Sequence, residues 1–266
     1  MSWKMPFWYN FNALPLAAGT ANAAPTASVF SSIPLTSQPD ADFEALRLAY
    51  TNTDPRVYLN FKDSTGKTFN DDPGLDARLY CGQLLNLGAG GNALILKNLA
   101  KPIPIPANTS FTAKMADFSG AQNNVRLCMH GVKDMPGVPP WVMRGRKYKE
   151  GGEQHWTVPA YSLGIAANGN AQPSIAAPAR RDLFITKILA IRTGAATIEM
   201  NAGGSGMDLQ NSPIHLDNLT GNIAGYNQLL QPIYIPALSS FWMNIVDLSG
   251  ATNNVTLHFE GVMKEF

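Results

Sequence analysis

The chain has 266 residues, which is enough for two domains of ordinary size, each with a core of its own. Only 15% of the residues are charged and the net charge is +1, so the strong positive field of a nucleic-acid-binding protein is excluded. The two cysteines are too few for a disulfide scaffold or for a zinc site built from cysteines alone. Low charge together with 23 Gly and 19 Pro indicates a β-rich protein with a largely uncharged surface, which suits burial against neighbouring subunits.

An internal repeat is the strongest feature of the sequence. Residues 102–132 match residues 232–262 without a gap, and 17 of these 31 positions are identical. The match continues upstream at shifted offsets, where Asp42 pairs with Asp182 and, further back, Trp8 pairs with Trp156. Nearly the whole chain is therefore a tandem duplication.

Each copy consists of short apolar segments separated by clusters of Gly, Pro, Asn and Asp. Several short strands at spacings near ten residues favour an all-β fold with little helix, made of two tandem jelly-roll-like β-sandwich domains. The predicted organisation is an extended N-terminal arm (1–28), a first β-sandwich (29–137), a linker with a second lead-in (138–179) and a second β-sandwich (180–266).

The N-terminal arm joins an aromatic cluster to an Ala- and Gly-rich stretch. No pattern in it would let it build a core alone, and aromatic rings dominate the anchoring of protein interfaces. We expect its rings to contact a neighbouring subunit; the alternative is that the arm folds back on its own sandwich as a first strand. The candidate interface residues are Trp3, Phe7, Trp8, Tyr9, Phe11, Trp141 and Trp156.

In the first copy, residues 42–50 and 57–61 are predicted to be strands. The prolines of the segment PIPIP at 102–106 cannot donate hydrogen bonds to a neighbouring strand, so this segment belongs at a sheet edge or in a connection. The segments DFSGAQNN (117–124) and DLSGATNN (247–254) are predicted to be hairpin-type loops, because Gly and Asn accept the positive φ of such turns.

The last strand of each copy alternates between apolar and other residues, which is typical of a strand buried on one face. A shift by one residue would exchange the two faces. The residues expected in the core are Val125, Leu127, Met129, Val255, Leu257 and Phe259. Those expected to face solvent or a partner are Cys128, His130, His258 and Glu260.

Between the copies, a basic run at residues 144–149 is followed directly by Glu150 and Glu153. This mixture of charges indicates a solvated linker. The Ala-, Gly- and Asn-rich stretch at 160–179 lacks helical periodicity and forms the lead-in to the second copy.

The duplication also tests for catalytic chemistry, because a site older than the duplication should occur twice. In the alignment of the two copies, the second copy has His258 at the position of Cys128 and Glu260 at the position of His130. Neither potential catalytic group is therefore shared. We therefore expect no catalytic residue, no metal and no cofactor, and we expect that the protein is not an enzyme. What the copies share, such as Asp117 and Gly120, are turn and packing residues.

The order of motifs in each copy carries a resemblance. In the second copy an Ala/Gly-rich lead-in and an Asp-Leu strand precede LQNSPIHLDNLTG (209–221), PIYIPA (232–237) and SGATNNVTLHFEGV (249–262). This order resembles that of virion structural proteins of tailed bacteriophages, of the capsid decoration and minor capsid type. The first copy departs from it, with NDDPGLDARLYCG at 70–82.

The resemblance implies a structural component of a phage virion, made in the host cytoplasm and attached to the head. The implied partners are further copies of the same chain, as in a trimer, and other virion proteins; no membrane and no nucleic acid is expected. A double jelly-roll major capsid protein and a head–tail collar accessory subunit are alternatives. From another class comes a carbohydrate- or receptor-binding module, with Trp141, Trp156 and Trp242 as its sugar platforms.

Overall fold

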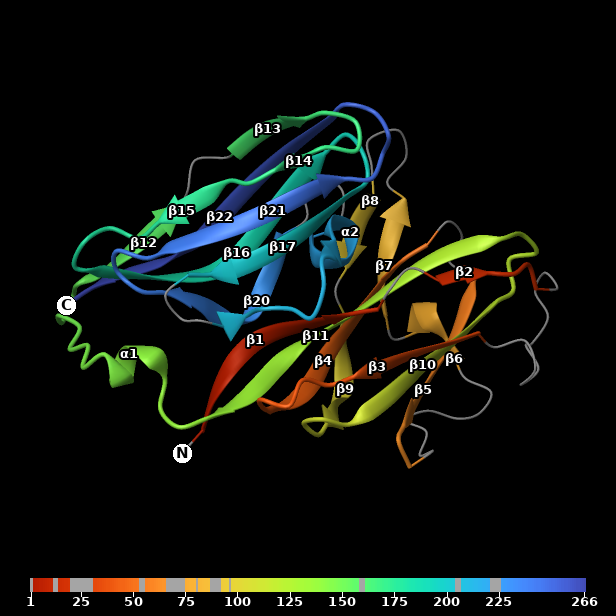
Figure 1. Ribbon diagram of the computed structural model, residues 1–266, viewed down its shortest axis with the longest axis horizontal. Coiled ribbons are helices and arrows are strands. Elements are labelled where there is room, and N and C mark those ends of the chain that lie inside the picture. Colours follow the sequence, from red (N-terminus) through yellow and green to blue (C-terminus); the bar gives the residue numbers. More distant parts are fainter. Residues whose placement is uncertain are drawn as a thin grey trace.

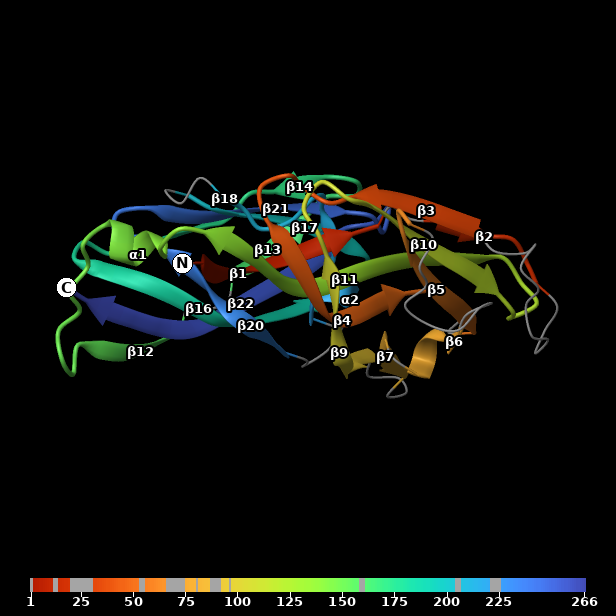
Figure 2. The same cartoon turned by 90° about the horizontal axis from the view of Figure 1, so that it is seen from below.

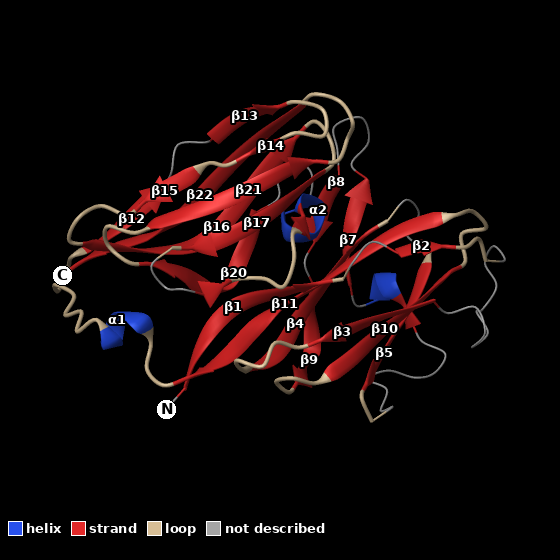
Figure 3. Cartoon of the chain, in the orientation of Figure 1, coloured by secondary structure: helices blue, strands red, loops and turns tan. Residues whose placement is uncertain are grey.

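The structure is a computed structural model in which two β-sandwich domains lie side by side (Figure 1). It describes residues 2–11, 14–19, 31–52, 56–65, 75–79, 81–86, 92–95, 97–157, 161–203, 207–220 and 226–266. Within these ranges the helical elements are η2 (Ala77–Leu79), α1 (Pro140–Met143) and α2 (Leu216–Thr220), and strands make up nearly all the rest of the regular structure (Figure 3). None of the helices in these ranges is long and apolar enough to cross a membrane.

The first domain has two layers, in which the described strands are antiparallel except for one parallel pair. Its first sheet contains, in order, β1 (Ser2–Asn10), β11 (Asn123–Pro136), β4 (Asp42–Thr51) and β9 (Lys97–Ile105). Strand β2 (Leu14–Leu16) also pairs with β11. Strand β7 (Cys81–Asn86) pairs in parallel with β4, and β8 (Asn92–Ile95) pairs with β7. Its second sheet joins β3 (Ser31–Thr36), β10 (Ser110–Asp117), β5 (Val57–Asp63) and β6 (Leu75–Asp76).

The second domain repeats this plan. Its first sheet joins β12 (Glu153–Thr157) and β13 (Tyr161–Ile165) to β22 (Asn253–Glu265), followed by β16 (Arg181–Arg192) and β20 (Tyr226–Ile235). Its second sheet joins β14 (Asn170–Ala171) and β15 (Ser174–Ala176) to β21 (Ser240–Asp247), followed by β17 (Ala196–Ala202) with β18 (Met207–Asp208) and β19 (Ile214–His215).

The strand order identifies the fold. When the short strands that continue one another are counted together, and the β7–β8 hairpin of the first domain is left out of the count, each domain has one sheet in which the first strand lies beside the last, then the third, then the sixth. The other sheet runs second, seventh, fourth, fifth. This exchange of successive strands between two sheets is the topology of a jelly roll. The predicted fold class, two tandem jelly rolls in an all-β chain, is confirmed.

Residues 2–10 and 14–16 of the predicted N-terminal arm are part of the first sheet and not a free arm, whereas residues 20–28 lie outside the described residues. Strand β1 pairs with β11 from Ser2 to Asn10, and β2 continues the same edge further along. Backbone pairing satisfies the polar groups of the segment, while its apolar side chains enter the sandwich. The lead-in to the second copy is corrected in the same way, because β12 to β15 belong to the second domain, which therefore begins near residue 153.

The loops 117–124 and 247–254 are not hairpins. Each one leads from a strand of one sheet to a strand of the other, because β10 and β11, like β21 and β22, lie in different sheets. The predicted backbone conformation is nevertheless present, with φ of +86° at Gly120 and +71° at Gly250.

An aspartate holds each of these crossings. The carboxylate of Asp247 accepts hydrogen bonds from the hydroxyl of Ser249 at 2.7 Å and from the side-chain amide of Asn253 at 3.0 Å. The Ser249 bond is the main reason that the pKa of Asp247 lies well below its usual range. Asp117 receives the corresponding bonds in the first domain. The shared Asp-x-Ser-Gly-x-x-Asn pattern therefore encodes a turn between two sheets.

The predicted division of the last strands into two faces is confirmed, but Cys128 and His130 do not face solvent or another subunit, because the second domain of the same chain buries them. All six residues expected in a core are fully buried. Leu127 belongs to the core of the first domain, whereas its neighbour Cys128 lies on the opposite face and packs into the core of the second domain. The segment PIPIP forms part of β9, which among the described strands pairs with β4 alone, so it occupies an edge as predicted.

A glycine stands opposite a bulge in both domains. The register between β4 and β11 shifts next to Gly131, and the register between β16 and β22 shifts next to Gly261. A Cβ atom at Gly131 would overlap the carbonyl oxygen of Glu44, and one at Gly261 would overlap that of Phe184. The shared Gly-Val motif is therefore needed for a close approach of two backbones.

We predict that Gly261→Ala lowers the free energy of unfolding by about 2 kcal/mol or more, because backbone atoms would have to move apart. Gly164→Ala is the matched control, since its Cβ would meet only the Asn254 side chain at 3.7 Å. Urea unfolding of both variants measures the difference. Equal stability of the two would contradict this account of the motif.

Candidate functional site: the junction between the domains

The junction between the domains is built around Trp8. Its neighbours on β1, Phe7 and Tyr9, point into the core of the first domain, so strand alternation directs Trp8 outward. Only 3% of Trp8 is exposed, because its ring packs into the core of the second domain. The Trp8 backbone pairs there too: its N–H donates to Leu209 O at 3.0 Å and its carbonyl accepts from Asn211 N at 3.3 Å.

His130 lies beside Trp8 with both ring nitrogens occupied. The indole N–H of Trp8 donates to His130 Nδ1 at 3.2 Å, so Nε2 carries the imidazole proton and donates to the carbonyl of Asn218 at 2.8 Å. Burial is the main reason that the pKa of His130 falls to about 4, and the positive charge of Arg47 adds to the effect. The ring is therefore neutral at physiological pH.

The short helix α2 carries the other side of the junction. The side-chain oxygen of Asn218 accepts a hydrogen bond from the Thr51 hydroxyl at 2.6 Å, and its amide donates to Arg126 O at 3.1 Å. Arg47 reaches across from β4 and donates to Gln228 O at 2.9 Å. These hydrogen bonds join polar groups of the two domains to each other, and those of Asn218 are partly buried.

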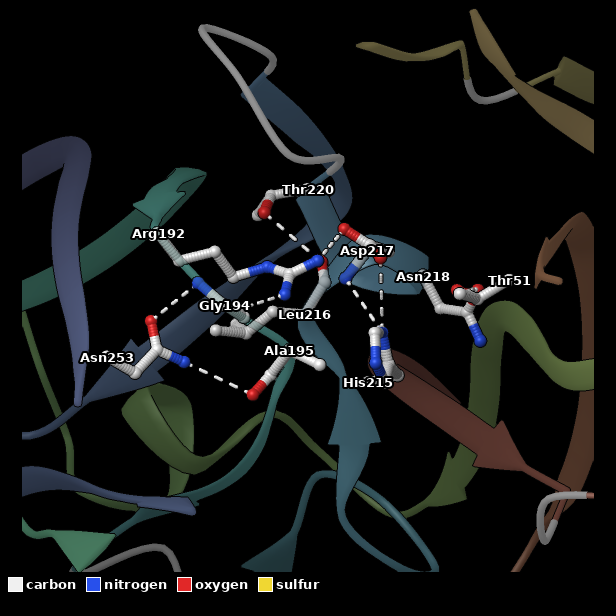
Figure 4. Close-up of polar contacts among 10 residues, drawn as sticks. All are labelled: Thr51, Arg192, Gly194, Ala195, His215, Leu216, Asp217, Asn218, Thr220 and Asn253. Atoms are coloured by element: carbon white, nitrogen blue, oxygen red, sulfur yellow. Dashed lines mark hydrogen bonds and ion pairs between the residues drawn. The ribbon is translucent and has the colours of Figure 1, made fainter. Parts of the chain in front are cut away.

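Behind α2 lies a buried charge cluster (Figure 4). Arg192 forms an ion pair with Asp217 at the start of the helix and donates to the carbonyl of Gly194. His215 accepts a hydrogen bond from the Asp217 N–H at 3.3 Å. Burial lowers the pKa of His215 to about 4, although the carboxylate of Asp217 opposes the shift. This cluster fixes the helix that receives His130.

The arrangement is suited to holding two domains together. In the part of the chain that is described, His130 and His215 contact backbone groups, an indole and a carboxylate, and neither ring faces a hydroxyl or thiol nucleophile. Burial raises the pKa of the Cys128 thiol, which is therefore not a thiolate. Within the same residues, no three His, Cys, Asp or Glu side chains gather as metal ligands.

The structure divides the candidate interface residues into two groups. Phe7, Tyr9 and Phe11 are buried in the core of the first domain and Trp8 is buried in that of the second, so none of these four rings can reach a neighbouring subunit. The expectation is corrected for them: the chain itself buries the apolar rings, as the alternative of a first strand requires.

The other three candidates are partly exposed. Trp3 packs edge-on against Trp141 with ring centroids 5.9 Å apart, and Trp141 also contacts Phe184 at 5.6 Å. Trp156 packs against the core of the second domain. These rings join the domains and the linker on one side, and a part of each remains at the surface.

The pairing of Trp8 with Trp156 in the repeat is wrong by one residue. Trp8 lies opposite His130, whereas Trp156 lies opposite Gly261. Since Gly261 is the counterpart of Gly131, the position equivalent to Trp8 is Thr157. No sequence signal identified the receiving residues Asn218 and Arg47, which become neighbours only when the two domains pack.

The basic linker run is bound to the second domain and not simply solvated. Arg146 forms an ion pair with the buried carboxylate of Asp182 at 3.3 Å. Asp182 also accepts a hydrogen bond from the Tyr148 hydroxyl at 2.9 Å. Lys149 forms an ion pair with Glu265. The positive charges of Arg146 and Lys149 are therefore paired with carboxylates of the same chain.

Comparisons with known proteins show a likeness of fold. No family model matches the sequence, and no curated protein matches it. A triple jelly-roll protein of an archaeal virus turret is similar over 96% of this chain at 8% identity and a TM-score of 0.29, and this chain spans 59% of its length. A Penaeus vannamei nodavirus protein matches over 98% of both chains at 11% identity and a TM-score of 0.22. The CBM22-1–CBM22-2 tandem domain of Paenibacillus barcinonensis Xyn10C matches over 97% of this chain and 93% of its own, at 8% identity and a TM-score of 0.18.

Proteins of viral particles therefore stand among these structural neighbours, together with a tandem domain of another kind. TM-scores below 0.3 carry no argument about function. The jelly-roll assignment of each domain rests on its own strand order.

We predict that Trp8→Ala lowers the free energy of unfolding by about 3–5 kcal/mol, because it leaves a cavity in the second core and removes the donor to His130. The matched control Trp3→Ala, at a partly exposed ring, should cost about 1 kcal/mol. Calorimetry should also show whether the domains then melt separately. A Trp8→Ala protein as stable as the control would contradict the role assigned to this ring.

Stability should depend on pH through the two buried histidines. Their folded pKa of about 4 lies below the ordinary value of 6.5, so between these values the unfolded chain binds more protons. The contribution is complete above about pH 6.5 and is lost as the pH falls towards 4, by about 3 kcal/mol for each ring.

Urea unfolding at about pH 7.5 and about pH 4.5 measures this loss. His130→Gln should reduce the difference between the two pH values, because one of the two rings is gone. Thr157→Val, which removes no titrating group at an exposed position, is the control and should leave the difference unchanged. A His130→Gln protein with the full pH dependence would refute the assignment.

Proposed function

We propose that the chain is a structural subunit of a virion, and more specifically a decoration or minor capsid protein that assembles on the head of a tailed phage. It acts by binding further copies of itself and other virion proteins, not by catalysis, and its location is the virion. The motif order of the two copies and the pair of rigidly joined jelly rolls support this proposal.

The observation that carries the proposal is a pair of equivalent sheet faces, one covered and one open. In the first domain the outer face with Trp8, Cys128 and His130 is covered by the second domain. The equivalent positions in the second domain are Thr157, His258 and Glu260, and all three are exposed or half-exposed.

The covered face of the first domain contacts a different surface of the second domain, so the contact between the domains is heterologous. Heterologous contacts can be repeated from chain to chain, where they build closed rings or extended layers. The open face is polar, as is the rim of an interface between separable proteins. Lys187 donates a hydrogen bond to Glu260 at 2.7 Å, and His258 lies 3.9 Å from the same carboxylate.

A double jelly-roll major capsid protein is the second candidate, and it is favoured by the completeness of both sandwiches. The two candidates differ in how many copies a particle holds. A major capsid protein builds the shell itself, whereas a decoration or minor capsid protein is added to a shell made of another chain. Quantitative mass spectrometry of purified particles separates them.

We predict that the purified chain forms oligomers and that Glu260→Arg weakens them, because it places a second positive group beside Lys187 on the open face. Glu150→Arg, an equal change of charge in the exposed linker, should leave the oligomers intact. Sedimentation velocity measures both, and calorimetry checks that the variants are folded. A chain that stays monomeric at all concentrations and does not bind particles would refute the proposed function.

A further inference from the structure

A hollow lies where the second sheet of the second domain meets the first domain. Figure 2 shows β18 and β21 on the same side of the molecule as β3, whose C-terminal end leads to Gln38. The lining side chains that matter here are Gln38, Glu199, Asn201, Asp208, Gln210 and Trp242. Only Gln38 comes from the first domain, so the hollow exists because the two domains are joined.

The hollow contains an exposed aromatic ring next to a row of polar groups. Trp242 on β21 is 39% exposed. The strand register places it opposite Asn201 of β17, and places Asn201 opposite Asp208 of β18. Residues paired in this way share one face of a sheet. The side-chain amide of Asn201 donates to Asp208 Oδ1 at 3.3 Å, which holds the carboxylate beside the ring.

A buried amide lies in the wall of the hollow. Gln210 lines the hollow and is only 6% exposed. Its side-chain nitrogen donates to Ile198 O at 3.2 Å, which fixes the amide, while its Oε1 has no hydrogen-bond donor among the residues described. A buried acceptor of this kind costs free energy unless a hydroxyl or water donates to it.

Going beyond the assembly role, we propose that this hollow binds a neutral carbohydrate. The apolar face of a pyranose ring stacks on the indole of Trp242, and sugar hydroxyls donate to Asp208 and Glu199. The two carboxylates disfavour acidic sugars and phosphate groups, because like charges repel in a partly desolvated site. The ligand is thus a chain of uncharged hexoses, as a free oligosaccharide or as a polysaccharide on a cell surface.

Among the described residues this site occurs in the second domain alone. In the repeat the position of Trp242 is taken by Thr112 in the first copy, and Thr112 pairs with Lys62 where Trp242 pairs with Asn201. The first domain therefore has no aromatic ring at this position, and a lysine stands where the second domain has Asn201. A single shallow site binds weakly, but several chains held in one assembly bind a repetitive polysaccharide together, since the second contact becomes intramolecular.

The test uses the full chain and defined ligands. Neutral glucan, galactomannan and mannan oligosaccharides are titrated by calorimetry and by tryptophan fluorescence, with hyaluronate and polygalacturonate as acidic counterparts. Co-sedimentation with cells that carry a neutral surface polysaccharide separates the surface form of the ligand from the free form. We expect at least one neutral glycan to bind and the acidic ones not to bind.

Variants locate the site. Trp242→Ala should weaken binding by about tenfold or more, Trp242→Phe should retain part of it, and Asp208→Asn should weaken it. Leu248→Ala removes another exposed apolar side chain, 42% exposed, and should leave binding unchanged. Melting temperatures verify that each variant is folded.

Three results would overturn the proposal: no binding of any neutral glycan, stronger binding of the acidic polymers, or unchanged affinity in a folded Trp242→Ala protein. If Trp242→Ala instead abolishes self-association while no glycan binds, the hollow is a protein contact. Failure of glycan binding alone leaves the assembly role untouched, because that role is measured by the oligomer and by Glu260→Arg.

Discussion

The ring of Trp8 leaves a strand of the first jelly roll and is buried in the core of the second, and the relative position of the two domains depends on this contact. Burial of so large an apolar group is worth on the order of 1.5–3 kcal/mol or more. The contact also brings an indole N–H, a histidine and a helix end into a region without water. Each of these polar groups has a partner, so the junction is specific as well as stable.

The same contact explains how two equal domains acquire different roles. A duplication begins with two identical faces, and either could be covered. Here the first domain has Trp8 where the second has Thr157, and His130 where the second has Glu260. Trp8 and His130 can be buried at a low cost in free energy, whereas Glu260 cannot, because a carboxylate loses more solvation free energy on burial than a neutral imidazole does. One face is covered, and its counterpart remains available to other molecules.

The fold could be predicted from the sequence because its signals are local. The apolar residues Val125, Leu127 and Met129 occur at every second position, which indicates a strand with one buried face. The repeat indicates that this strand occurs in both domains. A loop that crosses between two sheets and a hairpin loop both need Gly and Asn residues. The sequence of the two loops therefore does not distinguish a crossing from a hairpin. The arm was misjudged because its pairing partner, β11, lies more than a hundred residues away.

The site was harder to predict, for a physical reason. The bonds of Asn218 to Thr51 and to Arg126 join groups that no local pattern relates. The alignment of one tryptophan with another hid the actual register, in which Trp156 replaces Phe7 as a ring on the inner face. Residues that hold two domains together are chosen by packing, and packing is not periodic along the chain.

Strand β1 also imposes an order on biosynthesis. During translation β1 emerges before its edge partner β11, which ends at Pro136, and the core that receives Trp8 is complete only with Phe259. Synthesis must therefore proceed as far as Phe259 before β1 has all its contacts. Until then the nascent chain exposes an aromatic β-segment, which is the kind of sequence that chaperones bind and that aggregates when they are absent.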